Sequence, residues 1–436
     1  MILYDPTRIV QNSYEDMAAF STMHYFIRES LKGVLWKPSV QNYYLNLGLN
    51  AAELSTQLIE KTYRSRGFYH FVVSERGKIR DIHSVHISER AVQKALCNVI
   101  LKPAIVPRLY EYNCASLEGK GTSYALGALK RDLVRAYSKY GKNAYILITD
   151  YHAYYDSIRH DILLNMFRNW IEDDDGYGLF EYFVHMFDYI KIPNNEMNKE
   201  IKTQYSIPSK PDDISNPHSP LGKGVLDHRN LILADDQDII DADEHVMNDI
   251  DFGLGLGLGS EISQIAAVAY TNHIDHGIKE IYRADAYTKY MDDSYIIDHD
   301  YGKLQAILDY ITYESANIGL TFNPKHTHIY KITDHYRFLK KRIHVVPETG
   351  KVLMQLDGPA ITKHRNTIVA QYNLLIQGNI RFDTIFYSFY GWRQSVLGMD
   401  SYNNIKELSH VFYRLYKDFM TPEQKQKLFT ISKGER

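Results

Sequence analysis

Two adjacent acids, Asp292 and Asp293, stand between two β-like runs in the segment AYTKYMDDSYIID (286–298). Neighbouring carboxylates in a tight turn repel each other and resist burial, so we expect a cation to compensate them. A third acid, Asp150, ends the apolar run AYILITD (144–150), which predicts a buried strand. Three converging carboxylates can hold two Mg²⁺ ions that clamp the attacking and leaving oxygens of a phosphoryl transfer. The alternative is a polar hairpin turn that is exposed to solvent.

The elements that must position these acids follow from hydrophobic periodicity and from breaker residues. Residues 68–90 alternate on both sides of Gly77 and predict a β-hairpin, after which Ser88 is expected to cap a helix that Pro103 ends. Residues 253–270 predict a Gly-rich turn that leads into a helix of small apolar residues, and the last 80 residues are predicted to be helical. Together these patterns predict an α+β fold.

Charge is distributed unevenly along the chain. The 436 residues hold 50 Lys+Arg and 53 Asp+Glu, and the resulting net charge of −3 by itself argues against a nucleic-acid partner. However, residues 61–142 hold 16 basic and 6 acidic side chains, and residues 331–436 hold 17 and 9. Residues 172–251 hold 6 basic and 19 acidic ones. Two basic segments are thus available to bind phosphates, unless they are simply solvated helix faces.

Composition excludes several other classes of protein. With 44% hydrophobic and 24% charged residues the chain is globular rather than disordered. Its two cysteines, Cys97 and Cys114, cannot form a disulfide framework or a thiolate zinc site. The 19 histidines show no paired ligand spacing, so neither His152 nor His160 is assigned any chemistry. Because no signal peptide or membrane-spanning run is evident, we expect a soluble, cytoplasmic protein without a membrane partner.

The segments around the three acids resemble the palm of a reverse transcriptase. YMDD, ITDYHAYYDSI and the turn GSEISQ follow that family's order, and other motifs extend the resemblance over roughly residues 50–420. FVVSERGKIRDI, SERAVQKAL and SLEGKGTSYAL resemble its fingers, GLTFNPKHTHIYKI and YRFLKK the segments after the active-site hairpin, and FYGWRQSVLGMDSYNNIKEL the thumb of bacterial members.

The resemblance implies a right-hand polymerase in three parts. Residues 1–143 would form N-terminal helices and the fingers, and residues 144–335 the palm, an antiparallel sheet with helices. The palm would carry an irregular acidic insertion at about 172–251, and residues 336–436 would form the primer-grip region and a helical thumb.

The resemblance also implies roles for individual residues. Asp150 and Asp292 would be the principal ligands of two Mg²⁺ ions, for which Mn²⁺ could substitute, with Asp293 as the third carboxylate and the main-chain carbonyl of Tyr151 completing one site. Tyr155 would pack beneath the sugar of the incoming nucleotide and collide with a 2′-OH, which favours dNTPs, unless it is a core tyrosine.

Further residues would contact nucleotide or nucleic acid. Candidates for the nucleotide are Arg80, Lys78, Leu258, Gly259 and Lys325. Arg80 would contact the triphosphate, because a guanidinium can bind phosphate oxygens bidentately, and Lys325 would assist the leaving pyrophosphate. Surface-charge roles are the alternative for the lysines. Candidates for nucleic-acid contacts are Arg90, Lys120, Met291 and Lys340.

Some positions depart from the family pattern. Leu258 stands where many members carry a polar residue that touches the nucleotide and template, which leaves sugar or base discrimination open. Ser263-Gln264 resembles the diversity-generating and unassigned bacterial branches, which are related to the group II intron enzymes. Since no endonuclease, integrase or ribonuclease H signature is evident, the chain resembles stand-alone bacterial reverse transcriptases of phage defence.

The expected function is RNA-directed DNA synthesis, in which a primer 3′-OH is extended with dNTPs on an RNA template. The resemblance implies a structured non-coding RNA as partner and a DNA product, whereas nothing in the sequence sets an oligomeric state. One alternative is a template-independent polymerase, or a protein-primed one that uses one of the 36 tyrosines, as in abortive infection. The other is an RNA-binding scaffold with an inactive palm.

Overall fold

The chain folds into two compact units, each assembled from three segments. The computed structural model describes residues 13–75, 78–188, 253–257 and 259–429. The first unit comprises Met1–Glu118, Tyr151–Gly277 and Ile311–Thr321, and the second Gly119–Asp150, Ile278–Tyr310 and Phe322–Arg436. Neither unit coincides with one of the three segments predicted as fingers, palm and thumb, because each gathers pieces that are distant in the chain. Helices combine with antiparallel sheets, so the predicted α+β class is confirmed.

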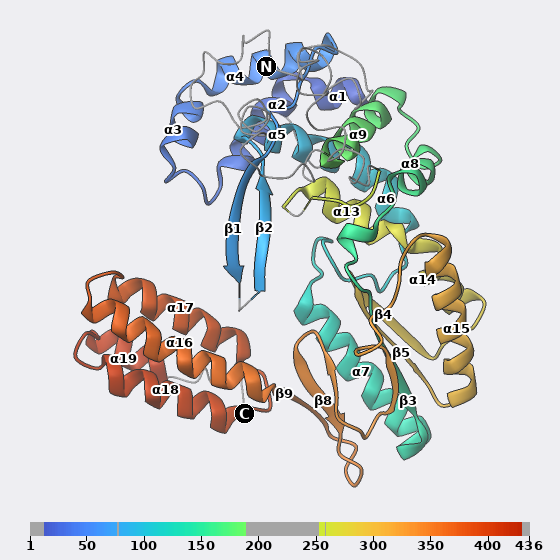
Figure 1. Ribbon diagram of the computed structural model, residues 1–436, viewed down its shortest axis with the longest axis vertical. Helices are drawn as coiled ribbons and strands as arrows, with labels where there is room; N and C mark the ends of the chain where they lie inside the picture. The colour runs from blue at the N-terminus through green and yellow to red at the C-terminus, as the bar shows by residue number, and fades with distance from the viewer. Residues whose placement is uncertain (1–12, 76–77, 189–252, 258, 430–436) are drawn as a thin grey trace, which may run out of the picture. The chain divides into compact units, whose positions relative to one another are not determined.

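Helices make up most of the first unit (Figure 1). Its core forms where α2 packs against α4 and α5. Its helices, among the described residues, are α1 (Tyr14–Ala18), α2 (Phe20–Leu31), α3 (Pro38–Leu45), α4 (Leu47–Ile59), α5 (Ile87–Leu96), α6 (Lys102–Ile105), α8 (His160–Arg168), α9 (Asp174–Met186), α13 (Glu261–Tyr270) and α14 (Asn272–Glu280), of which α14 ends with residues of the second unit. In the described part of the chain, no helix is long and apolar enough to cross a membrane.

The predicted hairpin is confirmed as β1 (Tyr69–Glu75) paired antiparallel with β2 (Lys78–Ser84). In Figure 1 the two strands extend together from the helices of the first unit. The predicted helix cap is wrong by two residues, because α5 begins at Ile87 and the ring of His86 accepts the N–H of Ser88. An imidazole nitrogen at the N-cap thus takes the role that was assigned to the serine hydroxyl.

Pro103 does not end the helix that α5 begins, contrary to the prediction. One turn of wider π-helix, Cys97–Leu101, follows α5, and the N–H of Lys102 donates to the carbonyl of Cys97 five residues back. Helix α6 then starts with the proline in its first turn, where a missing N–H costs little. Helical turns therefore continue through Pro103, although a proline would break a regular α-helix.

The acidic segment predicted to be irregular from residue 172 begins as an ordered helix. Helix α9 buries Leu179, Phe180 and Phe183, and the ring of Phe180 stacks on Phe167 of α8 with centroids 4.7 Å apart. Two acids, Asp174 and Asp175, lie in its first turn, where they complement the helix dipole. The rest of the predicted insertion, from 189 to 251, lies outside the described residues.

The second unit contains a four-stranded antiparallel sheet in the order β4-β5-β3-β6. Its strands are β3 (Tyr145–Asp150), β4 (Ala286–Tyr290), β5 (Asp293–Asp298) and β6 (His328–Lys331). Helix α7 (Thr122–Tyr140) packs against β4 and β5, and the hydroxyl of buried Tyr295 donates to Asp132 of this helix at 2.8 Å. Helix α15 (Tyr301–Asn317) has residues in both units. The predicted buried strand and strand–turn–strand are both confirmed.

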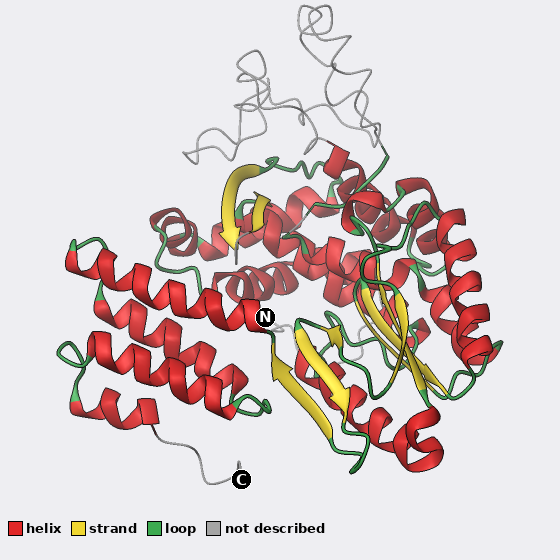
Figure 2. Ribbon diagram, turned by 60° about the horizontal axis from the view of Figure 1, so that its bottom comes forward, coloured by secondary structure: helices red, strands yellow, loops and turns green. Residues whose placement is uncertain are grey.

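A three-stranded sheet and a helical bundle complete the second unit. The sheet consists of β7 (Tyr336–Phe338), β8 (Lys341–Val345) and β9 (Val352–Leu356). The helices that follow this sheet lie side by side in Figure 2, in agreement with the prediction of a helical C-terminal segment. They are α16 (Gly358–Ile376), α17 (Phe382–Val396), α18 (Tyr402–Tyr416) and α19 (Pro422–Phe429).

Phe412 is central to the bundle, and its truncation tests how much the bundle depends on aromatic packing. The ring is fully buried and stacks on Phe389 with centroids 4.3 Å apart. Phe412→Ala is expected to lower the free energy of unfolding by about 3–5 kcal/mol, because transfer free energy is lost and a cavity remains. Urea unfolding monitored by circular dichroism checks this value. Exposed Phe419→Ala serves as control, and an equal effect of both variants would contradict the assigned packing.

Candidate active site

The ends of β3 and β5 bring the predicted catalytic acids of the second unit together. Asp150 and Asp293 are direct partners in the antiparallel register, and Asp292 lies in the two-residue turn between β4 and β5. The other turn residue, Met291, has a φ of 58°, as expected for a primed hairpin turn. A side chain in this region costs roughly 1 kcal/mol, so the tight turn that presents Asp292 is slightly strained.

The electrostatics of these acids favour a bound cation. Burial, followed by repulsion from Asp292 and Asp150, raises the pKa of Asp293 to about 7, while the charge of Lys340 acts in the opposite direction. A hard divalent ion such as Mg²⁺ binds carboxylate oxygens and would remove this repulsion. The donor set therefore fits the predicted metal, with Asp150, Asp292 and Asp293 as the residues that would hold it.

Neighbouring side chains orient Asp150. The main-chain N–H of Asn323 donates to the Asp150 carbonyl at 2.8 Å, and its side-chain amide donates to the Asp150 carboxylate at 3.3 Å. The Asp150 N–H donates to the hydroxyl of Thr327 at 3.3 Å. Behind the acids, the hydroxyls of Thr149 and Ser294 bond across the strands at 2.6 Å. Sequence reasoning missed Asn323, although it precedes the selected Lys325 by only two residues.

The predicted basic residues of the second unit lie at turns. Lys340 and Leu339, with φ of 63° and 47°, form the two-residue turn between β7 and β8, a type I′ geometry that brings the charge of Lys340 close enough to act on Asp293. Lys325 is exposed in the loop before β6. Lys120 precedes α7 and its ammonium lies 5.8 Å from the ring centroid of Tyr124. Their predicted roles stay predictions.

Tyr155 lies beside the Gly-rich turn in the first unit. The N–H of Leu256 donates to the Tyr155 carbonyl at 2.9 Å, and the N–H of Gly255 donates to the Ile158 carbonyl at 2.7 Å. A Cβ on Gly255 would lie 3.2 Å from the carbonyl oxygen of Asp156, and its φ is 88°, so only glycine permits this close approach. Two motifs a hundred residues apart are thereby joined through their backbones.

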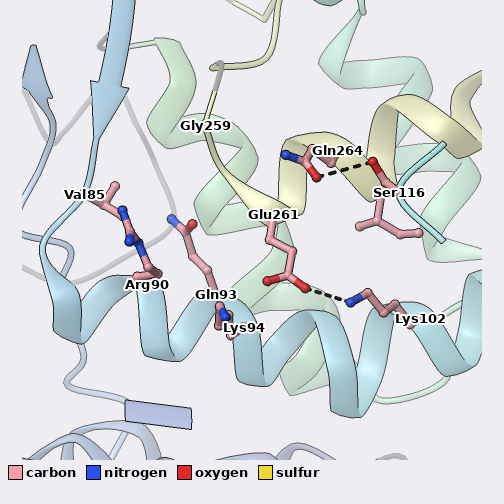
Figure 3. A pocket seen from close by; sticks show the side chains of 10 residues that line it. Val85, Arg90, Gln93, Lys94, Lys102, Ser116, Gly259, Glu261 and Gln264 are labelled. Atoms are coloured by element: carbon pink, nitrogen blue, oxygen red, sulfur yellow. Dashed lines mark hydrogen bonds and ion pairs between the residues drawn. The ribbon is translucent and has the colours of Figure 1, made fainter. Parts of the chain in front are cut away.

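A pocket of about 280 Å³ opens at the base of the hairpin in the first unit (Figure 3). Its lining residues are Val85, Arg90, Gln93, Lys94, Lys102, Ser116, Gly259, Glu261, Gln264 and Ile265. Lys102 forms a 2.7 Å ion pair with Glu261, and Ser116 donates to Gln264 at 3.3 Å. Three basic residues face one acidic residue, so the pocket suits an anionic ligand. It unites the predicted Arg90 and Gly259 and adds Lys94, which sequence reasoning did not select.

Glu89 connects this helix to the hairpin and was missed as a positioning residue. Its carboxylate, 1% exposed, accepts hydrogen bonds from the hydroxyl of Ser65 and from the N–H of Arg66 at 3.1 Å. These bonds tie the start of α5 to the loop that leads into β1. Desolvation by burial raises the pKa of Glu89 to about 7, since the charged form loses hydration that the hydrogen bonds only partly replace.

Glu89 should make stability depend on pH. The folded-state pKa of about 7 exceeds the usual value of 4.5, so stability present below pH 4.5 is lost as the pH rises towards 7. Glu89→Gln, which can keep one acceptor, is expected to stabilise the protein by up to about 3 kcal/mol at pH 7.5 relative to pH 4.5. Urea unfolding at both pH values measures this difference. Exposed Glu118→Gln is the control, and a pH-independent effect of Glu89→Gln would contradict the prediction.

Other predicted residues are located only in part. Lys78 and Arg80 lie in β2, where Arg80 pairs with Val73, and only their backbone is described. Leu258 lies outside the described residues. The side chain of Tyr151 is buried in the first unit, and its hydroxyl forms a 2.9 Å hydrogen bond with the hydroxyl of Ser315. The predicted metal contact of Tyr151 involves only its main-chain carbonyl.

Comparisons with known proteins give a structural likeness only. No family model matches the chain, and no curated protein matches it. It is similar to the structure of telomerase from Candida albicans in complex with a TWJ fragment of telomeric RNA, with 11% identity and a TM-score of 0.42 over 83% of this chain. It is also similar to apo telomerase from Candida tropicalis, with 11% identity and a TM-score of 0.36 over 84%. The chain spans 57% and 60% of these two proteins.

Proposed function

We propose that this protein is an RNA-directed DNA polymerase that adds dNTPs to a primer 3′-OH. The observation that carries the proposal is the antiparallel register that sets Asp150 opposite Asp293, with Asp292 in the adjoining turn. Three carboxylates gathered at strand ends suit metal-dependent phosphoryl transfer, whereas in the absence of a metal their mutual repulsion would destabilise the folded state. The order of motifs around them agrees with a reverse transcriptase.

In this proposal each group acts on a defined part of the reaction. Two Mg²⁺ ions, when bound, would activate the 3′-OH and neutralise the phosphates. Asp150 and Asp292 would hold the ions, and Asn323 would keep the Asp150 carboxylate oriented through its 3.3 Å hydrogen bond. Lys340 would face the primer strand, and Lys325 would balance charge on the departing pyrophosphate.

Several residues proposed to contact the nucleotide lie in the first unit. Arg80, together with Lys78, would contact the triphosphate from the hairpin, and Arg90 would bring positive charge to the pocket at its base. Tyr155, next to the Gly-rich turn, would exclude a 2′-OH. In this assignment the hairpin belongs to the fingers, the β4–β5 sheet to the palm and the C-terminal bundle to the thumb.

Primer extension followed by product sequencing tests the proposal. The full-length protein is supplied with Mg²⁺, dNTPs, a DNA primer and an RNA template of arbitrary sequence, and the product is expected to be the complement of that template. Homopolymeric or random DNA would instead identify a template-independent polymerase. DNA covalently linked to the protein would identify a polymerase that is primed by a tyrosine. If no nucleotide is incorporated on any template, the protein would instead be an RNA-binding scaffold.

We further propose that the template is a structured non-coding RNA partner and that the activity serves defence against phages. The proposal rests on the resemblance to stand-alone bacterial reverse transcriptases and on the two basic segments, 61–142 and 331–436. RNA that co-purifies with the protein from its native host should be one abundant species, complementary to the DNA product. A mixture that mirrors total cellular RNA would contradict this assignment.

A further inference from the structure

A second group of potential metal ligands lies in the first unit, where α8 begins and α9 ends. His160, His185 and Asp188 each offer a ligand atom, and these atoms all lie within 4.8 Å of one another. Oδ1 of Asp188 is 3.6 Å from Nδ1 of His160, and Oδ2 of Asp188 is 3.9 Å from Nδ1 of His185. The His160 and Asp188 side chains are almost completely buried, and His185 retains 19% exposure.

The protonation of His160 follows from its other nitrogen. Nε2 lies 2.7 Å from the carbonyl oxygen of Gly255, which can only accept, so Nε2 carries a proton. In the neutral ring, Nδ1 then directs a lone pair at the Asp188 carboxylate. Two acceptors that face each other require a proton or a metal cation between them. Their separation of 3.6 Å exceeds the length of a proton-mediated hydrogen bond.

The spacing agrees with the ligand sphere of a tetrahedral metal. Zinc binds imidazole nitrogen and carboxylate oxygen at about 2.0–2.2 Å, which places two ligand atoms of one tetrahedron about 3.4 Å apart. The observed separations, 3.6 Å from Oδ1 of Asp188 to His160 and 3.9 Å from its Oδ2 to His185, are only slightly larger. A carbonyl that receives the second N–H of a histidine, as that of Gly255 does, is the usual outer contact of a metal-bound imidazole.

We propose that His160, His185 and Asp188 bind a Zn²⁺-type divalent ion, distinct from the Mg²⁺ site. Two imidazoles and one carboxylate select zinc, cobalt or nickel over the hard magnesium ion. The site ties α8 and α9 to the Gly-rich turn, because the Asp188 carboxylate also accepts the N–H of Gly253 at 2.8 Å. Asp188 and Gly253 are the described residues that flank the stretch 189–252, so the ion would stabilise the contact between them.

A second cluster of the same kind does not need an ion. Asp285, Asp298 and His299 also bring three potential ligand atoms within 4.8 Å. There, however, Lys303 forms a 2.7 Å ion pair with Asp298, and Lys139 lies 3.6 Å from Asp285. The cations that balance these carboxylates are thus protein side chains.

Zinc content of the full-length protein tests the proposal. The protein is stripped with a chelator, refilled with Zn²⁺, desalted and analysed by inductively coupled plasma mass spectrometry. Wild type is expected to retain about one zinc per chain, as a tetrahedral site holds one ion. Two single variants, His185→Gln at the partly exposed ligand and Asp188→Asn at the buried one, should each lose the zinc. Zn²⁺ should also raise the melting temperature of wild type but not of the two variants.

Two control variants test whether the loss of zinc is specific to this cluster. His24→Gln replaces a histidine of α2 that lies outside the cluster, and Asp292→Asn removes a proposed Mg²⁺ ligand, so both should retain zinc. Co²⁺ in place of zinc should add visible absorption in wild type that is absent in His185→Gln. If wild type retains no more zinc than His185→Gln, the proposal is wrong, whatever the outcome of primer extension.

Discussion

Replacing Asp292 and Asp293 together by asparagine is expected to lower nucleotide incorporation by at least roughly a thousandfold. The carboxylates would hold the metal ions that stabilise the transferring phosphate, and a loss of about 4 kcal/mol of that stabilisation corresponds to this factor. Asparagine keeps the shape of both side chains, so the hairpin between β4 and β5 should persist. Initial rates of labelled dNTP incorporation with saturating Mg²⁺ measure the effect.

The same double variant should be more stable than wild type in metal-free buffer at neutral pH. Asp293 is half-buried beside two other acids, and desolvation together with their repulsion raises its pKa to about 7, so asparagine removes an unfavourable charge. A melting temperature equal to or above that of wild type would show that lost activity does not reflect unfolding. Asp309→Asn, on α15, is the matched control and should keep full activity. Unreduced synthesis by the double variant would overturn the assignment of the site.

Tyr155→Ala should let the enzyme use ribonucleotides. The Tyr155 carbonyl accepts the N–H of Leu256, which sets the residue beside the turn expected to receive the nucleotide. Without the ring, a 2′-OH no longer meets a steric barrier, so the preference for dNTP over rNTP in kcat/KM should fall by about 10- to 100-fold. Single-nucleotide incorporation with paired dNTP and rNTP concentration series gives this ratio.

Tyr155→Phe is the matched control for the gate. It keeps the ring and removes only the hydroxyl, so the preference for dNTPs should remain as in wild type. If Phe and Ala reduce the preference equally, the hydroxyl rather than the ring discriminates. If neither substitution changes it, Tyr155 serves the core through its edge-to-face contact with Tyr154 instead.

Local patterns in the sequence were sufficient for the hairpins and for the buried strand that ends at Asp150. Alternation with period two, broken by a short polar turn, specifies a hairpin whatever surrounds it. It also specifies that Asp292 and Asp293 lie at its tip. The opposition of Asp150 and Asp293 requires the pairing of β3 with β5, which joins segments about 140 residues apart. The resemblance to a polymerase implied this pairing, whereas periodicity alone did not.

Errors in the sequence-based expectations occurred where tertiary contacts outweighed local preference. Ser88 is a favourable N-cap, but the N-cap lies two residues earlier, where the ring of His86 supplies the acceptor. Pro103 is tolerated because a π-turn absorbs the missing hydrogen bond. The acidic start of α9 resembled a loop, yet the burial of Phe180 against α8 makes it a helix.

The sequence by itself determined the chemistry available to this protein: three acids near strand ends, basic segments and a Gly-rich turn. Only the tertiary structure decided which of these residues meet. Asn323 reaches Asp150, Glu89 holds the start of the hairpin, and His160 joins Asp188, although none of these pairs has a recognisable spacing. The reason is physical: spacing within one helix or strand is set by the backbone repeat, whereas contacts between elements depend on how their apolar faces pack.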